Sequence, residues 1–346
     1  MKTPLVFLVL SLAQLNLFCL PRGMAAEPIL IDETPARLMG VESRFWSTAF
    51  SPDGKSLLVT AGNENPDEPG ELTIWDVPKW TPKLIRRQEK TIRTAAYSPD
   101  GTRVATGDFA GIVRMIDPHT GQILSTLPPH SKLVNSVTFS ADGKILFVGS
   151  FDGQVTLWDV GQEKEQYTFS VGNDAVVSLA AASDDRHLAA VTWHGKVHLW
   201  DYPSRQKRYE LRVTKGLPNG PAIAEAIAFA PDGKTFVTGC WDTALSIRQT
   251  RNGKVLRELL GQEAAIHNAA YSPSGKFLVT SDMQGIVAVW DPDNGNLLEA
   301  LDAHQDRCFG LSFSRDGKRL ATVGWDHAAR IWDTETWKEV EKPKSP

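Results

Sequence analysis

Cysteine is scarce in this chain, with three residues in 346, and the familiar motifs built on cysteine, histidine or glycine are missing. No CxxC or HExxH pattern occurs, and neither does a GxSxG elbow, a Walker A loop or a glycine-rich dinucleotide fingerprint. These absences remove the common sequence signatures of zinc proteins, serine hydrolases and nucleotide-binding enzymes. No cofactor is therefore expected from motifs alone.

An excess of positive charge is also lacking, because the formal net charge is −4 at pH 7. Loss of Lys2 and Arg22 with an N-terminal leader would take it to −6, that is −4 − 2. Affinity for nucleic acid depends on clustered Lys and Arg meeting phosphates. An acidic chain with scattered basic residues is therefore expected to have no nucleic-acid partner.

The N-terminus carries a targeting pattern. Lys2 precedes an apolar stretch over residues 4–20, and the small residues Ala25 and Ala26 precede Glu27. This pattern predicts a cleaved secretory signal peptide over residues 1–26, and hence a periplasmic or extracellular protein, most simply of a bacterial envelope. The stretch is short for a membrane span of about 20 apolar residues, so no transmembrane segment is expected after cleavage. An uncleaved anchor is the alternative.

A repeated segment makes up most of the chain. Alternating apolar and polar residues flank each copy of a tight turn of the Asp-Gly type, which is the pattern of a β-hairpin. Two further strands follow in each repeat, and four-stranded units of roughly 42 residues predict a β-propeller. The turn positions recur every 42 to 47 residues, at Asp53, Asp100, Asp142, Asp185, Asp232, Ser274 and Asp316.

The end of the third strand carries a family signature. Five of the seven repeats end this strand in a Trp-Asp pair, in phase with the turns, and so the chain resembles the WD-repeat β-propeller family over about residues 36–341. The resemblance implies an all-β fold of seven blades with four antiparallel strands each, and implies almost nothing about a substrate. Blades two and five, which lack the Trp, and blade four, which lacks the turn glycine, are expected to be less regular. The paired tryptophans are Trp75, Trp158, Trp200, Trp290 and Trp332.

The repeats define the expected domain organisation. One propeller is expected over residues 30–342, followed by a tail at 343–346. Residues 36–39 align with a fourth strand that has no blade before it, so we expect them to complete blade seven and close the ring. The segment 336–342 is the alternative fourth strand. The repeat cores are expected at 44–77, 91–118, 133–160, 176–202, 223–250, 265–292 and 307–334.

No metal site or disulfide is expected. Cys240 and Cys308 fall in repeats five and seven, which are not neighbours, and a disulfide needs Cα atoms within about 7 Å. His194 and His198 share a strand face, but four strand residues span about 13 Å, too far for one ion. The acidic loop 62–70 has no recognised calcium pattern, so a solvated loop is favoured over a cation site.

Several polar residues that resemble a catalytic set are predicted to be structural. In WD-repeat proteins a His before the first strand, a hydroxyl in the second, an Asp in the next turn and the Trp of the third strand form a hydrogen-bonded chain. No nucleophile completes a triad here, and an indole N–H closing the chain suits a buried network, so the structural role is favoured over a catalytic one. The resemblance places this chain at His304, Thr322, Asp326 and Trp332 and, with Val148 at the hydroxyl position, at His130, Asp152 and Trp158.

Large apolar residues before the turn Asp are the strongest functional signal. Such turns normally use Gly, Asn, Asp or Ser, yet every repeat that can be aligned has a large apolar residue there. A ring of exposed aromatic groups would rival the largest apolar patch of a typical monomer, roughly 300–600 Å², and predicts a partner-binding face. The alternative is that these side chains lie flat on the next blade and shield the polar network. They are Phe109, Phe151, Trp193, Trp241, Met283 and Trp325.

A second set of positions lies on the first strands, four residues before the aromatic that ends each strand. Its residue types vary from repeat to repeat, as expected if a partner dictates them. In the WD-repeat β subunit of heterotrimeric G proteins corresponding positions contact partner proteins, so the resemblance implies a location for binding. Two longer loops, 62–70 and 213–225, are predicted on the same face. The set is Trp46, Arg93, Asn135, Ser178, Glu225, His267 and Phe309.

These patterns predict a non-catalytic, exported, monomeric interaction scaffold that binds a protein or peptide on an aromatic-rich top face. The alternative is a propeller enzyme of the hydrolase, lactonase or quinone-cofactor dehydrogenase type, with its site at the channel mouth. Arg93, Glu225 and His267 are the ionisable residues that would pose a substrate there. Three or more ionisable groups within hydrogen-bond reach of one another in the channel would favour catalysis, and an apolar rim would favour binding.

Overall fold

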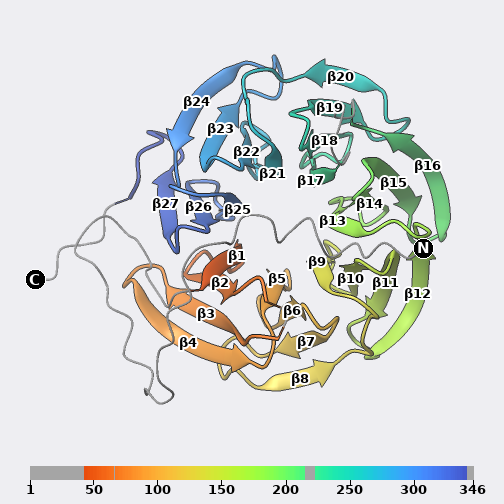
Figure 1. Cartoon of the computed structure of the whole chain (residues 1–346), viewed down its shortest axis with the longest axis vertical. Coiled ribbons are helices and arrows are strands. Elements are labelled where there is room, and N and C mark those ends of the chain that lie inside the picture. The colour runs from red at the N-terminus through yellow and green to blue at the C-terminus, as the bar shows by residue number, and fades with distance from the viewer. Residues whose placement is uncertain (1–42, 66, 215–222, 341–346) are drawn as a thin grey trace, which may run out of the picture. The chain divides into compact units, whose positions relative to one another are not determined.

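The computed structural model describes residues 43–65, 67–214 and 223–340. These residues form 27 β-strands in seven antiparallel sheets arranged as blades around a central channel, with no helix in the described ranges (Figure 1). The predicted seven-bladed propeller is confirmed. The leader expected over residues 1–26, the strand expected at 36–39 and the tail at 343–346 lie outside the described residues.

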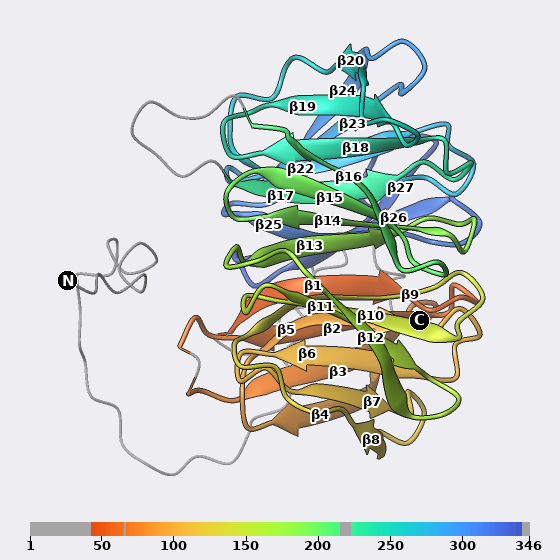
Figure 2. The same cartoon turned by 90° about the vertical axis from the view of Figure 1, so that its right-hand side faces the viewer.

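Each blade runs outward from the channel in chain order. In side view the outer strands β8 and β20 lie at opposite edges of the ring, and the inner strands β1 and β13 lie near its middle (Figure 2). Blades one to four contain β1 (Arg44–Phe50), β2 (Ser56–Gly62), β3 (Gly70–Asp76), β4 (Thr81–Gln88); β5 (Ile92–Tyr97), β6 (Val104–Asp108), β7 (Val113–Ile116), β8 (Ile123–Thr126); β9 (Val134–Phe139), β10 (Ile145–Ser150), β11 (Gln154–Asp159), β12 (Lys164–Ser170); and β13 (Val176–Ala181), β14 (His187–Thr192), β15 (Lys196–Asp201), β16 (Gln206–Arg212). Blades five to seven contain β17 (Ala224–Phe229), β18 (Thr235–Cys240), β19 (Leu245–Gln249), β20 (Val255–Glu258); β21 (Ile266–Tyr271), β22 (Leu278–Asp282), β23 (Ile286–Trp290), β24 (Leu297–Asp302); and β25 (Cys308–Phe313), β26 (Arg319–Gly324), β27 (Ala329–Asp333).

The hydrophobic core lies between neighbouring blades. The second strand of each blade is buried on both faces, because a sheet covers it on each side, and so its sequence reads as a nearly continuous apolar run. The third-strand tryptophans pack across these interfaces. Trp290 of blade six, which is fully buried, packs in one cluster with Val237 and Ile247 of blade five. Burial of apolar surface at about 25 cal/mol per Å² therefore stabilises the ring blade against blade.

Blades one and seven meet where the ring closes. The backbone N–H of Phe50 donates to the hydroxyl of Ser312 at 3.0 Å, and His327 Nδ1 lies 3.0 Å from the carbonyl oxygen of Ser43. The outer edge of β27 pairs with residues 338–340, because Val340 N–H donates to the carbonyl of Ile331 at 2.7 Å. Within the described residues the C-terminal segment thus occupies the edge that the sequence analysis assigned first to residues 36–39.

The irregular blades differ from expectation in one case. Blades two and five do have short outer strands, since β8 and β20 contain four residues each. Blade four has strands of ordinary length, because Asp185 adopts the left-handed φ of +50° that glycine has in the other turns. Asp184 then takes the role of the turn Asp and accepts the N–H of Arg186 at 2.9 Å. The predicted turn position in this blade was therefore wrong by one residue.

Candidate functional site at the channel mouth

The predicted hydrogen-bonded chain of blade seven is present and structural. His304 Nδ1 lies 2.8 Å from Asp326 Oδ1, and His304 Nε2 lies 2.8 Å from the hydroxyl of Thr322. The indole N–H of Trp332 donates to the same hydroxyl at 3.1 Å. The histidine is 2% exposed, so a substrate has no access to it. No sequence pattern pointed to Arg330, whose Nη1 lies 2.9 Å from Asp326 Oδ2 and adds a cation to this chain.

Blade three has the shorter version that the sequence predicted. His130 Nδ1 lies 3.0 Å from Asp152 Oδ2, which also accepts the backbone N–H of Ser131 at 3.1 Å. Val148 lies at the hydroxyl position, so Trp158 is not linked to the pair as Trp332 is linked in blade seven. A cavity lined by Val148 and Trp158, among others, lies at this place in blade three.

The predicted exposed ring of aromatic groups is more deeply packed than the sequence suggested. Trp325 is 7% exposed and joins Trp46 and Phe309 in one buried cluster, against which Phe109 packs. The ring centroids of Trp46 and Trp325 are 5.2 Å apart, and those of Phe309 and Trp325 are 5.0 Å apart. The shielding alternative therefore describes this cluster. The remaining pre-turn residues are half-buried, namely Phe109, Phe151, Trp193, Trp241 and Met283.

The half-buried aromatics continue as a belt around the channel mouth. Phe151 contacts Trp193 at 5.8 Å, and Trp193 contacts Trp241 at 6.1 Å, both between ring centroids. Edge-to-face and tilted arrangements at these distances stabilise aromatic pairs by about 0.5–1.5 kcal/mol beyond the area that they bury. Each of these contacts joins residues of neighbouring blades. Phe151, Trp193 and Trp241 therefore form one continuous surface, here called the aromatic belt.

Arginine side chains cover the buried aromatic cluster. The guanidinium carbon of Arg44 lies 4.1 Å from the centre of a Trp325 ring, and that of Arg307 lies 4.6 Å from it. Arg93 lies over Trp46 at 4.9 Å and over Phe309 at 5.2 Å. Each contact of this kind is worth about 0.5–2 kcal/mol, depending on how far it is desolvated. Together these three arginines place positive charge over a cluster that is otherwise apolar.

Glu225 is the polar centre of the mouth. Its Oε2 accepts the indole N–H of Trp241 at 2.5 Å and lies 2.7 Å from His267 Nδ1. Its Oε1 lies 3.8 Å from Arg93 Nη2. Three ionisable groups from β17, β21 and β5 therefore converge in the channel, although the sequence distributes them over three blades. His267 lies within hydrogen-bond reach of Glu225, whereas Arg93 at 3.8 Å lies beyond it, so the criterion that favours catalysis is met only in part.

The protonation of this centre follows from its partners. Burial raises the pKa of Glu225, but His267, Arg93 and the N–H of Trp241 outweigh it and hold the pKa below the ordinary value. The carboxylate is therefore anionic at neutral pH. Burial lowers the pKa of Arg93, and the neighbouring carboxylate partly opposes that shift. The group of three is thus an ion pair to which a histidine is attached.

A small polar cavity lies beside this centre. It measures about 100 Å³, and a hydroxyl or amide side chain lines it at each of several positions. His267 is 5% exposed, and its Nε2 has no hydrogen-bond partner among the described residues. With Nδ1–H donated to Glu225, as the network assigns it, Nε2 presents a lone pair to a donor. The lining includes Ser47, Thr94, Asn135, Ser136, Ser178 and Asn268.

Comparison with known proteins gives two family matches and one relative. Residues 102–307 match the family described as the cytochrome D1 heme domain, and residues 295–333 match the WD domain, G-beta repeat. The chain is similar to eukaryotic translation initiation factor 3 subunit I of Lodderomyces elongisporus, with 33% identity over 94 residues. That match covers 24% of this chain and 27% of the relative. This short match therefore supports the assignment of WD repeats and carries no conclusion about the activity of the whole protein.

The heme-domain match corrects the prediction that the protein is not an enzyme. A family described as a heme domain points to a cofactor-binding or catalytic role, and no short motif in the sequence had indicated such a role. The prediction that the protein is not an enzyme is therefore wrong. Whether this channel fits the heme itself is a separate question of space and donors.

The channel residues do not fit a heme. Ligand pockets for groups of this size are roughly 300–1,000 Å³, whereas the cavity beside His267 is about 100 Å³. The ring of Phe309 stacks on His267 at 4.4 Å between centroids and covers one face of the imidazole. Burial also raises the pKa of the Cys240 thiol to about 12, so it is no thiolate ligand. No chemical step is therefore assigned to this group.

Two further observations limit the site. In the ranges 43–65, 67–214 and 223–340, no set of three or more His, Cys, Asp or Glu side chains is arranged to hold a metal ion. Within the same ranges no helix has the length and apolar character needed to cross a membrane. Cys240 and Cys308 are free and buried.

Proposed function

The chain belongs to the cytochrome D1 heme domain family and is a seven-bladed WD-repeat propeller, and from the second of these features we propose that its channel mouth binds a protein or peptide segment. A WD-repeat propeller is a scaffold for protein interaction, and its top face gathers the variable loops and first-strand positions of all blades. The proposal places the partner over the aromatic belt and the Glu225 centre.

One observation carries the proposal, namely the half-buried aromatic belt beside a charged, partly open centre. Trp193 and Trp241 are in contact with each other and with their neighbours, so they are rigid, and both retain some exposed surface. Rigid aromatic and arginine side chains are the usual anchors of protein interfaces, each worth about 2 kcal/mol or more when truncated. Arg93 supplies such a cation over Trp46, beside Glu225. The buried cluster of Trp46, Phe309 and Trp325 is joined to this surface through His267, whose ring contacts both Trp241 and Phe309.

The proposal also assigns a polar contact. The cavity of about 100 Å³ beside His267 has room for one small polar group of a bound segment. A hydroxyl or amide N–H would donate to His267 Nε2, while an oxygen of the same group would accept from Arg93. Such a contact selects for a polar residue at the centre of the bound segment.

Catalysis or small-ligand binding at the same mouth is the second candidate function. Two observations favour it, the heme-domain family match and the convergence of Arg93, Glu225 and His267. Perturbed ionisable groups that meet in a cleft are typical of functional sites. The size of the cavity restricts this candidate to a small polar molecule.

The proposal places the protein outside the cytoplasm, in the periplasm or the extracellular space. Its support is the N-terminal pattern of Lys2, the apolar stretch 4–20 and the small residues before Glu27. N-terminal sequencing of the protein recovered from the culture medium or the periplasmic fraction tests it. A mature N-terminus near residue 27 supports export with cleavage, and an intact N-terminus in the cytoplasmic fraction contradicts it.

A partner capture with matched variants tests the binding proposal. Full-length protein would be compared with Phe151→Ala/Trp193→Ala, whose members make ring contacts in the belt, and with Leu260→Ala. Leu260 is 78% exposed after β20 and is the control for removal of a large apolar side chain. All three proteins must first melt cooperatively.

Loss of a partner by the double variant alone supports the proposed mouth. Equal capture by all three proteins contradicts it and moves the binding surface elsewhere. Capture by none contradicts the scaffold and leaves the second candidate, which a screen for small polar ligands by calorimetry would then address.

A further inference from the structure

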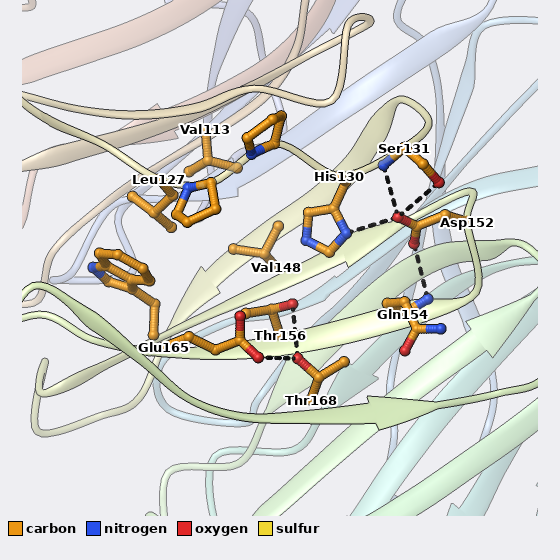
Figure 3. A pocket seen from close by; sticks show the side chains of 13 residues that line it. Val113, Leu127, His130, Ser131, Val148, Asp152, Gln154, Thr156, Glu165 and Thr168 are labelled. Carbon is orange, nitrogen blue, oxygen red and sulfur yellow. Dashed lines mark hydrogen bonds and ion pairs between the residues drawn. The ribbon is translucent and has the colours of Figure 1, made fainter.

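A second cavity lies between blades two and three, away from the channel. It measures about 380 Å³ and shares no lining residue with the cavity beside His267. One wall is the face of the blade three sheet, where Val148, Thr156 and Thr168 are cross-strand neighbours on β10, β11 and β12 (Figure 3). The opposite wall comes from the end of blade two and includes Leu127, Pro128 and Pro129. His130 and Asp152 lie at one end of it (Figure 3).

The corresponding place in blade seven contains an arginine of the chain itself. Arg330 pairs with Thr322 across the strands, as Thr156 pairs with Val148 in blade three. Its Nη1 lies 2.8 Å from His304 Nδ1, and Nε lies 3.8 Å from Glu339 Oε1. With the carboxylate of Asp326 at 2.9 Å, the guanidinium lies between two acidic groups and a histidine.

Blade two repeats this arrangement with different partners. Arg114 occupies the same register position, opposite Thr106. Its Nη1 lies 2.8 Å from Asp108 Oδ2 and donates to Gln88 Oε1 at 2.9 Å. Two blades of the ring therefore fill this place with a guanidinium held by an aspartate, which is Asp326 of the turn in blade seven and Asp108 at the end of β6 in blade two.

Blade three has the same acidic and histidine side chains that surround Arg330 in blade seven, but it has no arginine at this place. Asp152 and His130 match Asp326 and His304, and Glu165 opposes Trp158 as Glu339 opposes Trp332. Thr156 stands in the position of the arginine, and its short side chain reaches only the hydroxyl of Thr168, at 3.2 Å. The acidic receptor is thus present without the cation that occupies it in blade seven.

We infer that this cavity is a binding site for a guanidinium group, supplied by the arginine side chain of a ligand. The planar guanidinium forms charge-assisted hydrogen bonds with carboxylates, and Arg330 Nη1 makes one such bond to Asp326 Oδ2 within this chain. Asp152 at one end and Glu165 at the other supply the carboxylates. Trp158 and the two prolines form the apolar wall along which the methylene stem would lie.

The charge state of the receptor agrees with a cationic ligand. Burial raises the pKa of Asp152, but His130 and the backbone N–H groups of Gln154 and Ser131 outweigh it and keep the pKa below the ordinary value. The carboxylate is therefore anionic at neutral pH. A neutral or anionic ligand would leave this partly buried charge without a counter-ion.

Calorimetric titration of the full chain with a blocked arginine tests the inference. The probe is Nα-acetyl-arginine-N-methylamide, and the matched ligand is its citrulline analogue, which has the same shape without the charge. Agmatine is the third probe and distinguishes a free guanidine from an arginine within a peptide. We expect the arginine probe to bind at least tenfold more tightly than the citrulline probe at low ionic strength.

Thr156→Arg is the decisive variant, because it should fill the receptor from within as Arg330 does in blade seven. We expect it to reduce binding of the arginine probe at least tenfold, whereas Thr81→Arg, which adds the same charge on exposed β4, should not. Glu165→Gln should weaken binding several-fold, and Glu89→Gln, which removes the same charge from an exposed loop residue, should not.

The inference is overturned if the arginine and citrulline probes bind equally, if neither binds at millimolar concentration, or if folded Thr156→Arg binds like the wild type. Should Thr156→Arg not fold, the citrulline comparison and Glu165→Gln decide the question. Tighter binding of agmatine than of the blocked arginine would assign the site to a free guanidine, and the reverse order to a protein segment. Each order supports the guanidinium site, and neither depends on the proposal for the channel mouth.

Discussion

His267 Nδ1 lies 2.7 Å from Glu225 Oε2, although 42 residues separate them and they belong to different blades. The same carboxylate lies 3.8 Å from Arg93 on a third blade. Only the closed ring brings these strands together, since the first strands of different blades line the mouth side by side. The channel mouth therefore contains a group of three ionisable side chains that no single repeat contains.

Glu225→Gln should destabilise the protein by about 1–3 kcal/mol. The amide keeps the shape and one acceptor, but it leaves Arg93 as a buried cation without its counter-ion. Urea unfolding at pH 7 measures the change. Glu163→Gln on an exposed turn is the control and should stay within about 0.5 kcal/mol of the wild type.

A double-mutant cycle identifies the cause of that loss. Arg93→Met combined with Glu225→Gln should cost less than the sum of the two single changes, because the pair is removed together. Strict additivity would show that the ion pair across the channel contributes nothing, and that Glu225 acts only through His267 and Trp241.

The variant Asp326→Asn should lose less stability than the wild type as the pH falls into the acid range. Burial raises the pKa of Asp326, but His304 and Arg330 outweigh it and hold the pKa far below the usual value. A carboxyl group whose folded-state pKa is depressed adds stability above its unfolded pKa of about 3.9, and loses it as the pH falls toward the folded value.

Thermal unfolding between pH 7 and pH 2 checks this expectation. The wild type should lose more of its melting temperature below about pH 4 than the variant does. Asp232→Asn, at an exposed turn, is the matched control. Parallel curves for wild type and Asp326→Asn would exclude this carboxyl group as a source of acid sensitivity.

The propeller could be predicted from the sequence because its signals are local and repeated. Each repeat encodes its own turn, its hairpin alternation and the end of its third strand, which is a Trp-Asp pair in five repeats. Seven copies in phase restrict the possible folds to a seven-bladed ring. The polar chain of blade seven was predictable for the same reason, since its members keep fixed spacings. Asp185 shows the limit, because an Asp can adopt the left-handed φ that the pattern assigns to Gly.

The exposure of the aromatic residues could not be predicted in this way. Trp46 and Trp325 pack together because blade one meets blade seven, and nothing in either repeat specifies that neighbour. The role of Arg330 was missed because its partners become visible only when the register with Thr322 is known. Burial and convergence across blades are properties of the closed ring and not of the repeat.

Both cysteines should be inert to thiol reagents in the folded protein. Burial raises the pKa of Cys240 to about 12 and moves the pKa of Cys308 still higher, so neither forms a thiolate at neutral pH. An Ellman assay on protein that lacks Cys19 should find no reactive thiol before denaturant and two after it. A reactive thiol in the native state would contradict the packing of β18 or β25.

His198 should make the protein less stable between pH 6.5 and pH 4. It is 2% exposed, and neither ring nitrogen has a hydrogen-bond partner among the described residues. Burial lowers its pKa to about 4, Lys207 adds to the shift, and Glu210 opposes it. The unfolded chain binds a proton in this window and the folded chain does not, so stability rises with pH by at most about 3 kcal/mol across it.

His198→Leu provides the test, because it removes a buried polar ring that stacks on Trp200 and replaces it with an apolar side chain. Urea unfolding at pH 7 and pH 5 should show a smaller pH difference for the variant than for the wild type, and a gain in stability at pH 5. His119→Leu, at an exposed turn, should leave the pH difference unchanged. If His198→Leu keeps the full pH difference, the imidazole is protonated in the folded state and pairs with Glu210, whose Oε2 lies 3.6 Å from its Nδ1.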